Sequence, residues 1–176
     1  MTERIFHVSD RPDIARFDPR PAPSPGYGQE GLMVWAISEE MLHNYLLPRD
    51  CPRVTFYALP RSTPEDVERF LGLSAAKYVV AIESKWLPEV RRGCLYLYEM
   101  PPETFTRSTD GSGYCISRAS VVPLSVRRVD DLLGEITRRD VELRIVPSLW
   151  KLSDAVIRSS LAFSNIRMRN ASPRSS

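Results

Sequence analysis

Two stretches near the start of the chain decide how its fold is interpreted: Ile5-Phe6-His7-Val8-Ser9 and Met33-Val34-Trp35-Ala36-Ile37. Each is mostly apolar, with one polar or aromatic side chain at its centre, which is typical of a short buried strand. Two such strands, each with one group able to face a cleft, are a common basis for a nucleotide pocket. We therefore expect two buried strands whose central residues, His7 and Trp35, are candidate ligand contacts.

The composition favours one small soluble domain. The chain has 176 residues, 43% of them hydrophobic, which is enough for one compact core and short for two. We expect a single domain over residues 1–171 and a disordered tail over 172–176. The 24 basic and 22 acidic residues leave a net charge of +2, which gives no general attraction to nucleic acid or membranes. No apolar run approaches the length of a signal peptide or membrane span.

The cysteines and histidines argue against a disulfide framework and a metal site. Cys51, Cys94 and Cys115 are odd in number and widely spaced among apolar residues, which suits reduced thiols and a cytoplasmic location. His7 and His43 are the only histidines, and no acid or cysteine is clustered with either of them. No metal is therefore expected.

The pattern of apolar residues and breakers predicts an α+β fold. Thr63-Pro64-Glu65-Asp66 is a strong helix start and Gly72 a stop. Strands are expected at 4–8, 33–37, 53–59, 77–83, 94–99, 113–122 (bent) and 142–146, and helices at 10–13, 38–47, 63–71, 87–92, 129–138 and 149–161. This irregular alternation favours sheets that pack on each other with helices at their edges. Gly26-Tyr27-Gly28, in the proline-rich loop 19–28, lacks the third glycine of a dinucleotide-binding loop.

Segments in both halves of the chain resemble ADP-ribosyltransferase-like proteins. In the first half they are Ile5-Phe6-His7-Val8-Ser9, Phe17-Asp18-Pro19-Arg20 and Val34-Trp35-Ala36-Ile37-Ser38. In the second half they are Gly93-Cys94-Leu95-Tyr96-Leu97-Tyr98, Tyr114-Cys115-Ile116-Ser117 and Pro123-Leu124, which resemble small bacterial members of that group. A closer resemblance, to an uncharacterised family of bacterial conserved hypothetical proteins, rests on Pro48-Arg49-Asp50-Cys51-Pro52-Arg53, Ser148-Leu149-Trp150 and the run from Phe163 to Ala171.

The broader resemblance implies a split β-sandwich with peripheral helices that binds NAD in a cleft. In that group a first-strand histidine holds the ribose hydroxyls of the nicotinamide half, and His7 matches it. A second-strand aromatic stacks on the nicotinamide ring, and Trp35 is the candidate where a tyrosine is more usual. The group also has a glutamate in a later strand that stabilises the oxocarbenium-like transition state. Around residues 114–117, where it is expected, this sequence has no Glu or Asp.

Each candidate residue also has a purely structural interpretation. His7 is either a core histidine bonded to backbone or a ligand contact, and Ser9, two residues on, shares its face. Trp35 is either core packing or a stacking partner. Arg20 either binds a phosphate or pairs with an acid. Arg49 either complements the negative end of the preceding helix or forms an anion site.

Three hypotheses about function follow. The first is an ADP-ribosyltransferase-like enzyme in which His7 and Trp35 act in catalysis and His7, Ser9, Arg20, Trp35 and Arg49 bind NAD or a related nucleotide. Its acceptor would be a protein or a nucleic acid. The second is an inactive module of the same fold that binds a nucleotide or an RNA end. The third is a scaffold protein in which His7 and Trp35 belong to the core. None of the three involves a membrane.

Overall fold

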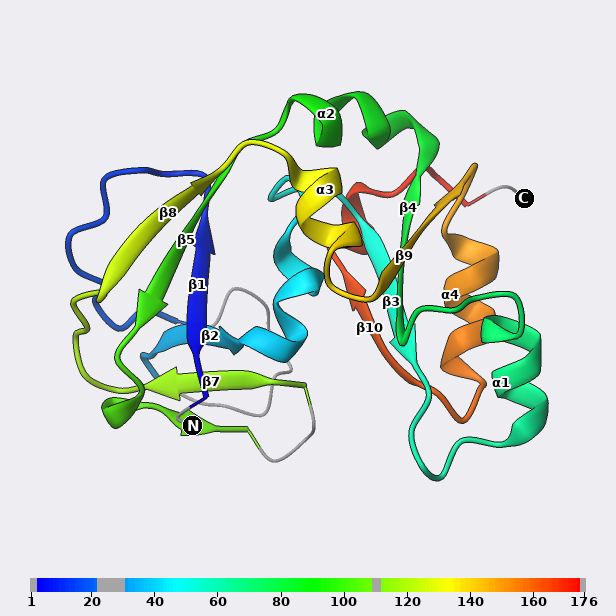
Figure 1. Ribbon diagram of the computed structural model, residues 1–176, viewed down its shortest axis with the longest axis horizontal. Helices are drawn as coiled ribbons and strands as arrows, with labels where there is room; N and C mark the ends of the chain where they lie inside the picture. The colour runs from blue at the N-terminus through cyan, green and yellow to red at the C-terminus, as the bar shows by residue number, and fades with distance from the viewer. Residues whose placement is uncertain (1–2, 22–30, 109–111, 175–176) are drawn as a thin grey trace. The chain divides into compact units, whose positions relative to one another are not determined.

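The computed structural model describes residues 3–21, 31–108 and 112–174, so most of the expected loop 19–28 lies outside the described residues. The chain divides into two compact units. Unit 1 consists of Met1–Tyr45 and Cys94–Val129, and unit 2 of Leu46–Gly93 and Asp130–Ser176. Each unit has its own sheet and a few helices (Figure 1), which confirms the α+β class.

Unit 1 is built on a six-stranded sheet in the order β6-β7-β2-β1-β5-β8. The strands are β1 (Ile5–Ser9), β2 (Val34–Ser38), β5 (Leu95–Met100), β6 (Thr106–Arg107), β7 (Tyr114–Ser117) and β8 (Ser125–Val129). Two 3-10 helices, η1 (Glu39–Tyr45) and η3 (Pro102–Thr104), follow β2 and β5. The α-helix expected at 38–47 is therefore a shorter 3-10 helix.

One face of this sheet packs against the segment that leaves β1. Phe17 lies in a buried cluster with residues of four strands; its other buried members are Ile5, Val34, Ala36, Tyr98, Met100, Cys115 and Val121. Because side chains alternate between faces along a strand, the intervening residues of these strands belong to the opposite face. Unit 1 thus has a core on the face of Ile5 and Tyr98.

The helical turn expected at 10–13 does not form, and tertiary contacts explain why. The Ser9 hydroxyl accepts a hydrogen bond from the Arg11 backbone N–H at 3.1 Å. The Tyr98 hydroxyl donates to the Arg11 carbonyl at 2.6 Å and accepts from the Ile14 N–H at 3.2 Å. Further on, Phe17 forms a backbone bridge. The backbone groups that a helix would need are therefore used in holding this segment against the sheet.

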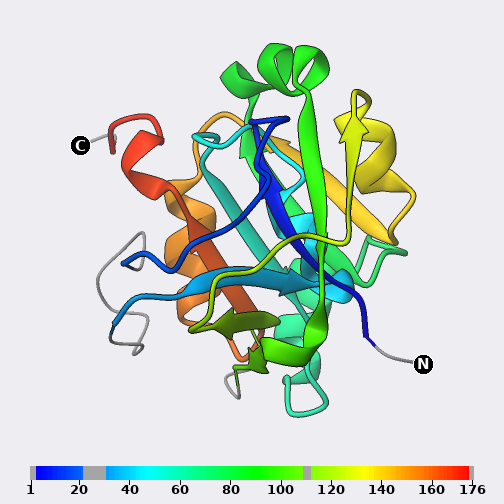
Figure 2. The ribbon, with the colours of Figure 1, turned by 90° about the vertical axis from the view of Figure 1, so that its left-hand side faces the viewer.

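Unit 2 is built on a four-stranded sheet in the order β10-β3-β4-β9 (Figure 2). Its strands are β3 (Arg53–Tyr57), β4 (Tyr78–Glu83), β9 (Val141–Val146) and β10 (Ala162–Ile166). Its helices are α1 (Pro64–Leu71), α2 (Leu87–Arg92), α3 (Leu132–Thr137) and α4 (Trp150–Ile157), with 3-10 helices η2 (Ser84–Trp86) and η4 (Met168–Asn170). Strands β4 and β9 run parallel, and the other neighbours are antiparallel.

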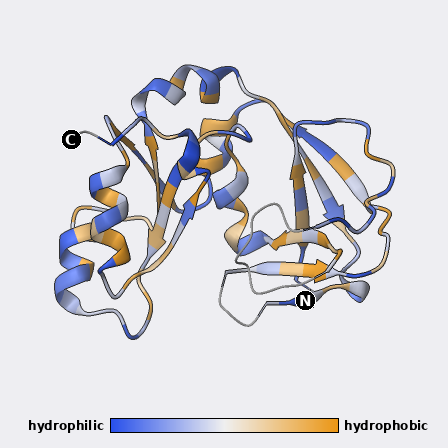
Figure 3. Ribbon diagram, turned by 180° about the vertical axis from the view of Figure 1, so that it is seen from behind, coloured by the Kyte–Doolittle hydropathy of each residue, from blue (hydrophilic) through white to orange (hydrophobic). Residues whose placement is uncertain are grey.

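The core of unit 2 lies between the sheet and helices α1 and α4. Every residue of β4 is buried, and residues of β3 and β4 cluster with Phe70 of α1 and Val156 of α4. Helix α1 begins where the sequence predicts, because Thr63 caps it by accepting a hydrogen bond from the Asp66 N–H. Figure 3 shows hydrophilic and hydrophobic residues mixed along α1 and along the strands of the sheet.

Several expected boundaries are wrong. The bent strand 113–122 ends at Ser117, and Val121 forms only an isolated bridge with Phe17. Of the helix expected at 129–138, only Leu132–Thr137 is helical, since Val129 ends β8. The helix at 149–161 is shortened to Trp150–Ile157, and β6, β8 and β10 were not expected. Among the described residues, no helix is long and apolar enough to cross a membrane.

Candidate functional site

The pairing of β1 with β2 stops after two residue pairs. Ile5 lies opposite Ser38 and Phe6 opposite Ile37, whereas β1 pairs with β5 through all five residues. Figures 1 and 2 both show β1 running across β2 rather than alongside it. Residues 7–9 of β1 therefore pair with β5 but not with β2. We call this place the β1–β2 divergence.

His7 spans the β1–β2 divergence. Its Nδ1 atom lies 2.7 Å from the Trp35 carbonyl oxygen. Because a carbonyl oxygen can only accept, Nδ1 carries the proton and donates, and in the neutral ring Nε2 is then an acceptor. The ring is half-buried, and its centroid lies 4.6 Å from the centroid of the Phe17 ring. His7 therefore has one ring nitrogen engaged with β2 and its ring against the core.

Ser9 ends β1, and Arg20 forms an isolated backbone bridge with Met33. Ser9 is buried, and its hydroxyl accepts from the Arg11 N–H, so it helps to hold the chain that leaves β1. Arg20 pairs through its backbone N–H and carbonyl with Met33, which precedes β2. Its side chain is exposed and makes no hydrogen bond or ion pair with the described residues. Arg20 is thus a cation whose backbone partner, Met33, lies two residues before Trp35 in the chain.

The Trp35 side chain projects from the face opposite that of His7. Ile5 and Ala36 belong to the buried cluster against which the His7 ring packs, so they lie on the same face of the sheet as His7. Trp35 is the neighbour of Ala36 in β2, and its side chain therefore points to the other face. The indole instead meets Tyr114 of β7, with ring centroids 5.5 Å apart in an edge-to-face arrangement. The hydroxyls of Tyr114 and Tyr45 form a hydrogen bond.

Two members of this aromatic group, Tyr45 and Tyr114, were not among the residues predicted for the site. A signal for Tyr114 was available, since it lies in the strand where a catalytic carboxylate was sought. No comparable signal pointed to Tyr45, because its contact with Tyr114 joins positions far apart in the sequence.

No carboxylate lies on β7, whose residues are Tyr114, Cys115, Ile116 and Ser117. In β5, Glu99 is engaged by Arg4 through two hydrogen bonds of 2.8 and 2.9 Å. The Arg4 guanidinium holds the pKa of Glu99 below its usual range. Among the described residues, no group of histidines, cysteines and acids could hold a metal ion.

Arg49, the remaining predicted site residue, belongs to unit 2. It is exposed in the turn before β3. The carbonyl of the next residue, Asp50, accepts a hydrogen bond from the Asn170 side chain at 2.8 Å. The turn that carries Arg49 is therefore tied to the C-terminal part of unit 2.

Unit 2 contains a buried carboxylate that the sequence did not single out. Glu83, at the end of β4, has a fully buried side chain. Its oxygens accept from the Leu149 N–H at 3.3 Å and from the Ser172 N–H at 3.0 and 3.1 Å. They also accept from the Ser172 hydroxyl, and Lys85 forms an ion pair at 3.3 Å.

Residues 172–174 of the expected disordered tail are held in place. Ser172 donates to Glu83 and accepts a hydrogen bond from the Trp150 indole N–H at 2.6 Å. Arg174 pairs with Asp154 and lies over the Trp150 ring, 4.3 Å from its centroid. This end of the chain therefore joins β4 to the start of α4.

The comparisons with known proteins identify one family. The model of a family of unknown function, DUF6886, matches residues 6–171. No curated protein and no solved structure matches the chain. The match covers the three segments on which the closer resemblance rests, residues 48–53, 148–150 and 163–171, and it confirms the prediction of an uncharacterised family. Because it spans nearly the whole chain, the protein belongs to this family of unknown function, DUF6886.

Proposed function

We propose that unit 1 is an ADP-ribosyltransferase-like module that binds NAD or a related nucleotide at the β1–β2 divergence. The observation that carries the proposal is the register of β1. Residues 7–9 keep their pairs with β5 and have none with β2. One of these three, His7, is the residue that the sequence resemblance assigns to the ribose, and Ser9 shares its face of the strand. In a continuous antiparallel pair, β2 would instead form backbone hydrogen bonds along this edge of β1.

His7 is suited to a ribose. Its Nδ1–H donates to the Trp35 carbonyl, which holds the ring in one tautomer and one orientation. The neutral ring then has an acceptor at Nε2, which can take a hydrogen bond from a ribose hydroxyl. The Ser9 hydroxyl, on the same face of β1, can donate to the same sugar because its oxygen already accepts from Arg11.

Trp35 and Arg20 supply the other contacts of the proposal. A ligand that lies between two diverging strands, near the plane of the sheet, can meet groups from both faces. The indole face of Trp35 then stacks on nicotinamide or a base, with Tyr114 against its edge. Arg20, held beside Met33, has a guanidinium fork that matches a phosphate.

The proposal is for binding rather than for ADP-ribosyl transfer. Cleavage of the glycosidic bond of NAD develops positive charge on the ribose, and a carboxylate normally stabilises it. Strand β7 carries none, and the loss of one such group costs about 3–4 kcal/mol of barrier. We therefore expect the nucleotide to be bound without release of nicotinamide, which an assay of free nicotinamide over hours measures directly.

The first test is thermal unfolding of the full chain with NAD, ADP-ribose, nicotinamide or ATP. A ligand that binds only the folded state, present at about 100 times its Kd, stabilises by roughly 2.7 kcal/mol. For a chain of this size we expect a rise in Tm of about 5–10 °C. His7→Ala and Arg20→Ala should remove or reduce the rise. Arg16→Ala is the control, because Arg16 lies in the same segment but pairs with Asp18. The proposal is overturned if no ligand shifts the wild type, or if His7→Ala responds as fully.

A further inference from the structure

One end of the unit 2 sheet gathers four segments that are distant in sequence. At this end Arg53 of β3 lies opposite both Ile82 of β4 and Ile166 of β10. Glu83 of β4 lies opposite Val146 of β9. The segments that enter or leave the strands here are residues 46–52, 83–93, 147–154 and 167–174, and we call this surface the basic end of unit 2.

The basic end of unit 2 carries more positive charge than the chain as a whole. Its four segments contain eight Lys and Arg residues and four Asp and Glu residues, while the whole chain has a net charge of only +2. Two of the four acids are engaged within this end, because Glu83 pairs with Lys85 and Asp154 with Arg174. The surplus of cations is therefore local.

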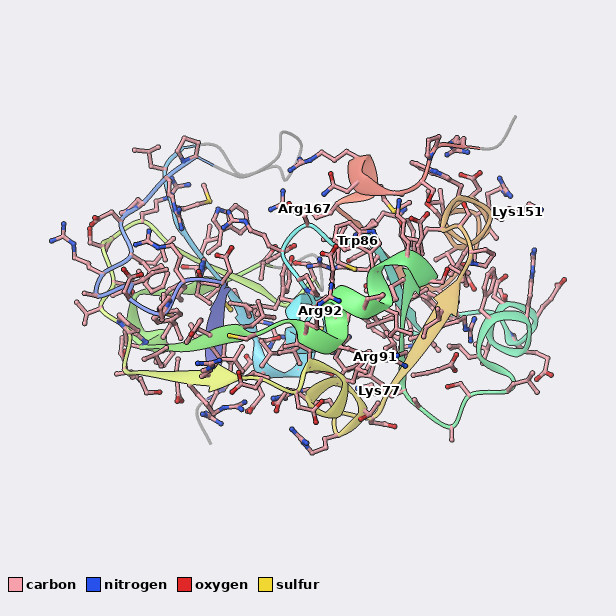
Figure 4. All side chains as sticks on the ribbon, turned by 90° about the horizontal axis from the view of Figure 1, so that it is seen from above. Lys77, Trp86, Arg91, Arg92, Lys151 and Arg167 are labelled. Atoms are coloured by element: carbon pink, nitrogen blue, oxygen red, sulfur yellow. The ribbon has the colours of Figure 1, made fainter. Side chains whose placement is uncertain are left out.

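Five of these cations have no ion pair with the described part of the chain: Arg169, which is exposed in η4, and the four considered next. Arg91 and Arg92 occupy the last turn of α2, and both are exposed. Lys151 is exposed in the first turn of α4, and Arg167 is half-buried between β10 and η4. The side chains of these four form no ion pair or hydrogen bond with a described residue. Figure 4, which looks onto this end, shows α2 with its two arginines and the segments that carry Lys151 and Arg167 around it.

The side chains of this surface distinguish between a membrane, another protein and a phosphate-bearing molecule as its partner. A membrane-binding surface or a protein interface normally includes exposed apolar side chains. The exposed large hydrophobic residues of the described chain all lie outside the four segments. The cations that remain are mostly arginines, whose planar fork pairs with phosphate oxygens and stacks on bases. Trp86, in η2 between β4 and α2, adds a half-buried aromatic ring.

We propose that the basic end of unit 2 binds the phosphate backbone of a nucleic acid through Arg91, Arg92, Lys151 and Arg167. The inference is independent of nucleotide binding by unit 1, because it uses neither His7 nor Trp35. The surface recognises phosphates that follow one another along a strand. Binding is therefore weakly dependent on base sequence and strongly dependent on salt.

The test measures fluorescence anisotropy of a labelled single-stranded RNA of mixed sequence with the full chain, over a range of salt concentrations and without NAD. DNA of the same sequence shows whether the 2′-hydroxyl contributes. The variant Arg91→Ala/Arg92→Ala/Arg167→Ala removes three cations from the basic end. The matched control, Arg61→Ala/Arg69→Ala/Arg158→Ala, removes three exposed cations from segments that join the strands at the opposite end.

The expected result is that the wild type binds RNA and that only the first variant loses affinity, by at least tenfold at low salt. Each phosphate contact contributes roughly 0.7 to the slope of log affinity against log salt for single strands. The first variant should therefore have a slope smaller by about 2, and the control the wild-type slope.

Three outcomes overturn the inference: no RNA binding by the wild type at low salt, an equal loss in both triple variants, or displacement of the RNA by polyglutamate as readily as by unlabelled RNA. The last would show that bare charge, and not phosphate, is recognised. Arg91→Ala/Arg92→Ala alone provides a second test if the triple variant unfolds, because both side chains are exposed and neither forms a hydrogen bond or ion pair with a described residue.

Discussion

His7 reaches the backbone of Trp35, with 2.7 Å between Nδ1 and the carbonyl oxygen, although the two side chains project from opposite faces of the sheet. Strands β1 and β2 no longer pair at this point. The His7 side chain, and not a backbone N–H of β1, therefore donates the hydrogen bond to the Trp35 carbonyl. His7 therefore has a structural task as well as its proposed role in ribose binding.

The two tasks of His7 can be separated by substitution. An asparagine side chain can donate its N–H near the position of Nδ1 but has no group at the position of Nε2. We expect His7→Asn to keep the bond to Trp35 and most of the stability while losing the Tm rise with NAD. His7→Ala should also lose about 0.5–1.5 kcal/mol of unfolding free energy, the net value of one hydrogen bond. Urea unfolding with and without NAD measures both effects. Equal nucleotide binding by wild type and His7→Asn would contradict the assigned role of Nε2.

Trp35 fluorescence should report the bound ring. If nicotinamide or a base stacks on the indole, NAD should quench the intrinsic emission of the wild type, and Trp35→Phe should lose the change. The comparison uses Trp35→Phe rather than substitution of the other tryptophans, because the Trp150 indole N–H donates to Ser172 and its loss would disturb unit 2. A quench that persists in Trp35→Phe would place the ligand near Trp86 or Trp150 instead.

The elements that the sequence predicts well have both a local signal and a buried environment. Residues 78–83 are β-branched and apolar and form the buried strand β4. The cap at Thr63 and the proline at Pro64 start α1 as expected. In these segments local propensity and tertiary packing agree, so a pattern of single residues is enough.

The elements that it misses depend on distant partners. Strand β8 has four exposed residues and two arginines, and pairing with β5 at the sheet edge defines it. Because Val129 also fits the spacing of the helix that follows, the sequence favours helix where the chain is still a strand. Likewise, Tyr98 lies far along the chain from residues 10–14, and its contacts replace the helical turn expected there.

The candidate site is predictable in part for the same reason. His7, Ser9 and Trp35 lie on two strands that the apolar pattern identifies, but the structure places His7 and Ser9 on one face of the sheet and the Trp35 side chain on the other. Arg49 does not join them, because it belongs to unit 2. Glu83 was not recognised as a polar centre, since a glutamate at the end of an apolar run gives no sign that residues 66 and 89 positions later donate to it.

The cysteines should differ in reactivity in the order of their burial. Burial raises the pKa of the Cys51 thiol to about 12 and also raises the pKa of Cys115. Since the thiolate is the nucleophile, both should resist iodoacetamide in the folded protein at about pH 8, whereas half-buried Cys94 reacts faster. All three should react in urea, and peptide mapping identifies the modified residue. Modification of native Cys51 as fast as Cys94 would contradict the buried, reduced state.

Glu83 should make the stability of unit 2 sensitive to acid. Burial by itself raises the pKa of this carboxyl, but hydrogen bonds from Ser172, Leu149 and Lys85 outweigh it, and the net pKa lies below the ordinary value. A group whose pKa is lowered by folding stabilises the folded state above its unfolded pKa, near 4.3 for glutamate. That contribution is lost as the pH falls through the folded pKa.

We therefore expect Glu83→Gln to lose about 2–4 kcal/mol of unfolding free energy at neutral pH, because the amide leaves buried N–H donors poorly matched. The difference from wild type should shrink below about pH 4, as the wild-type carboxyl itself takes up a proton. Urea unfolding at a series of pH values gives both numbers. Glu65→Gln, on the exposed first turn of α1, is the control and should track the wild type. An equal loss at acid and neutral pH would mean that the shape of the side chain, and not its charge, holds Ser172 and Leu149 to the end of β4.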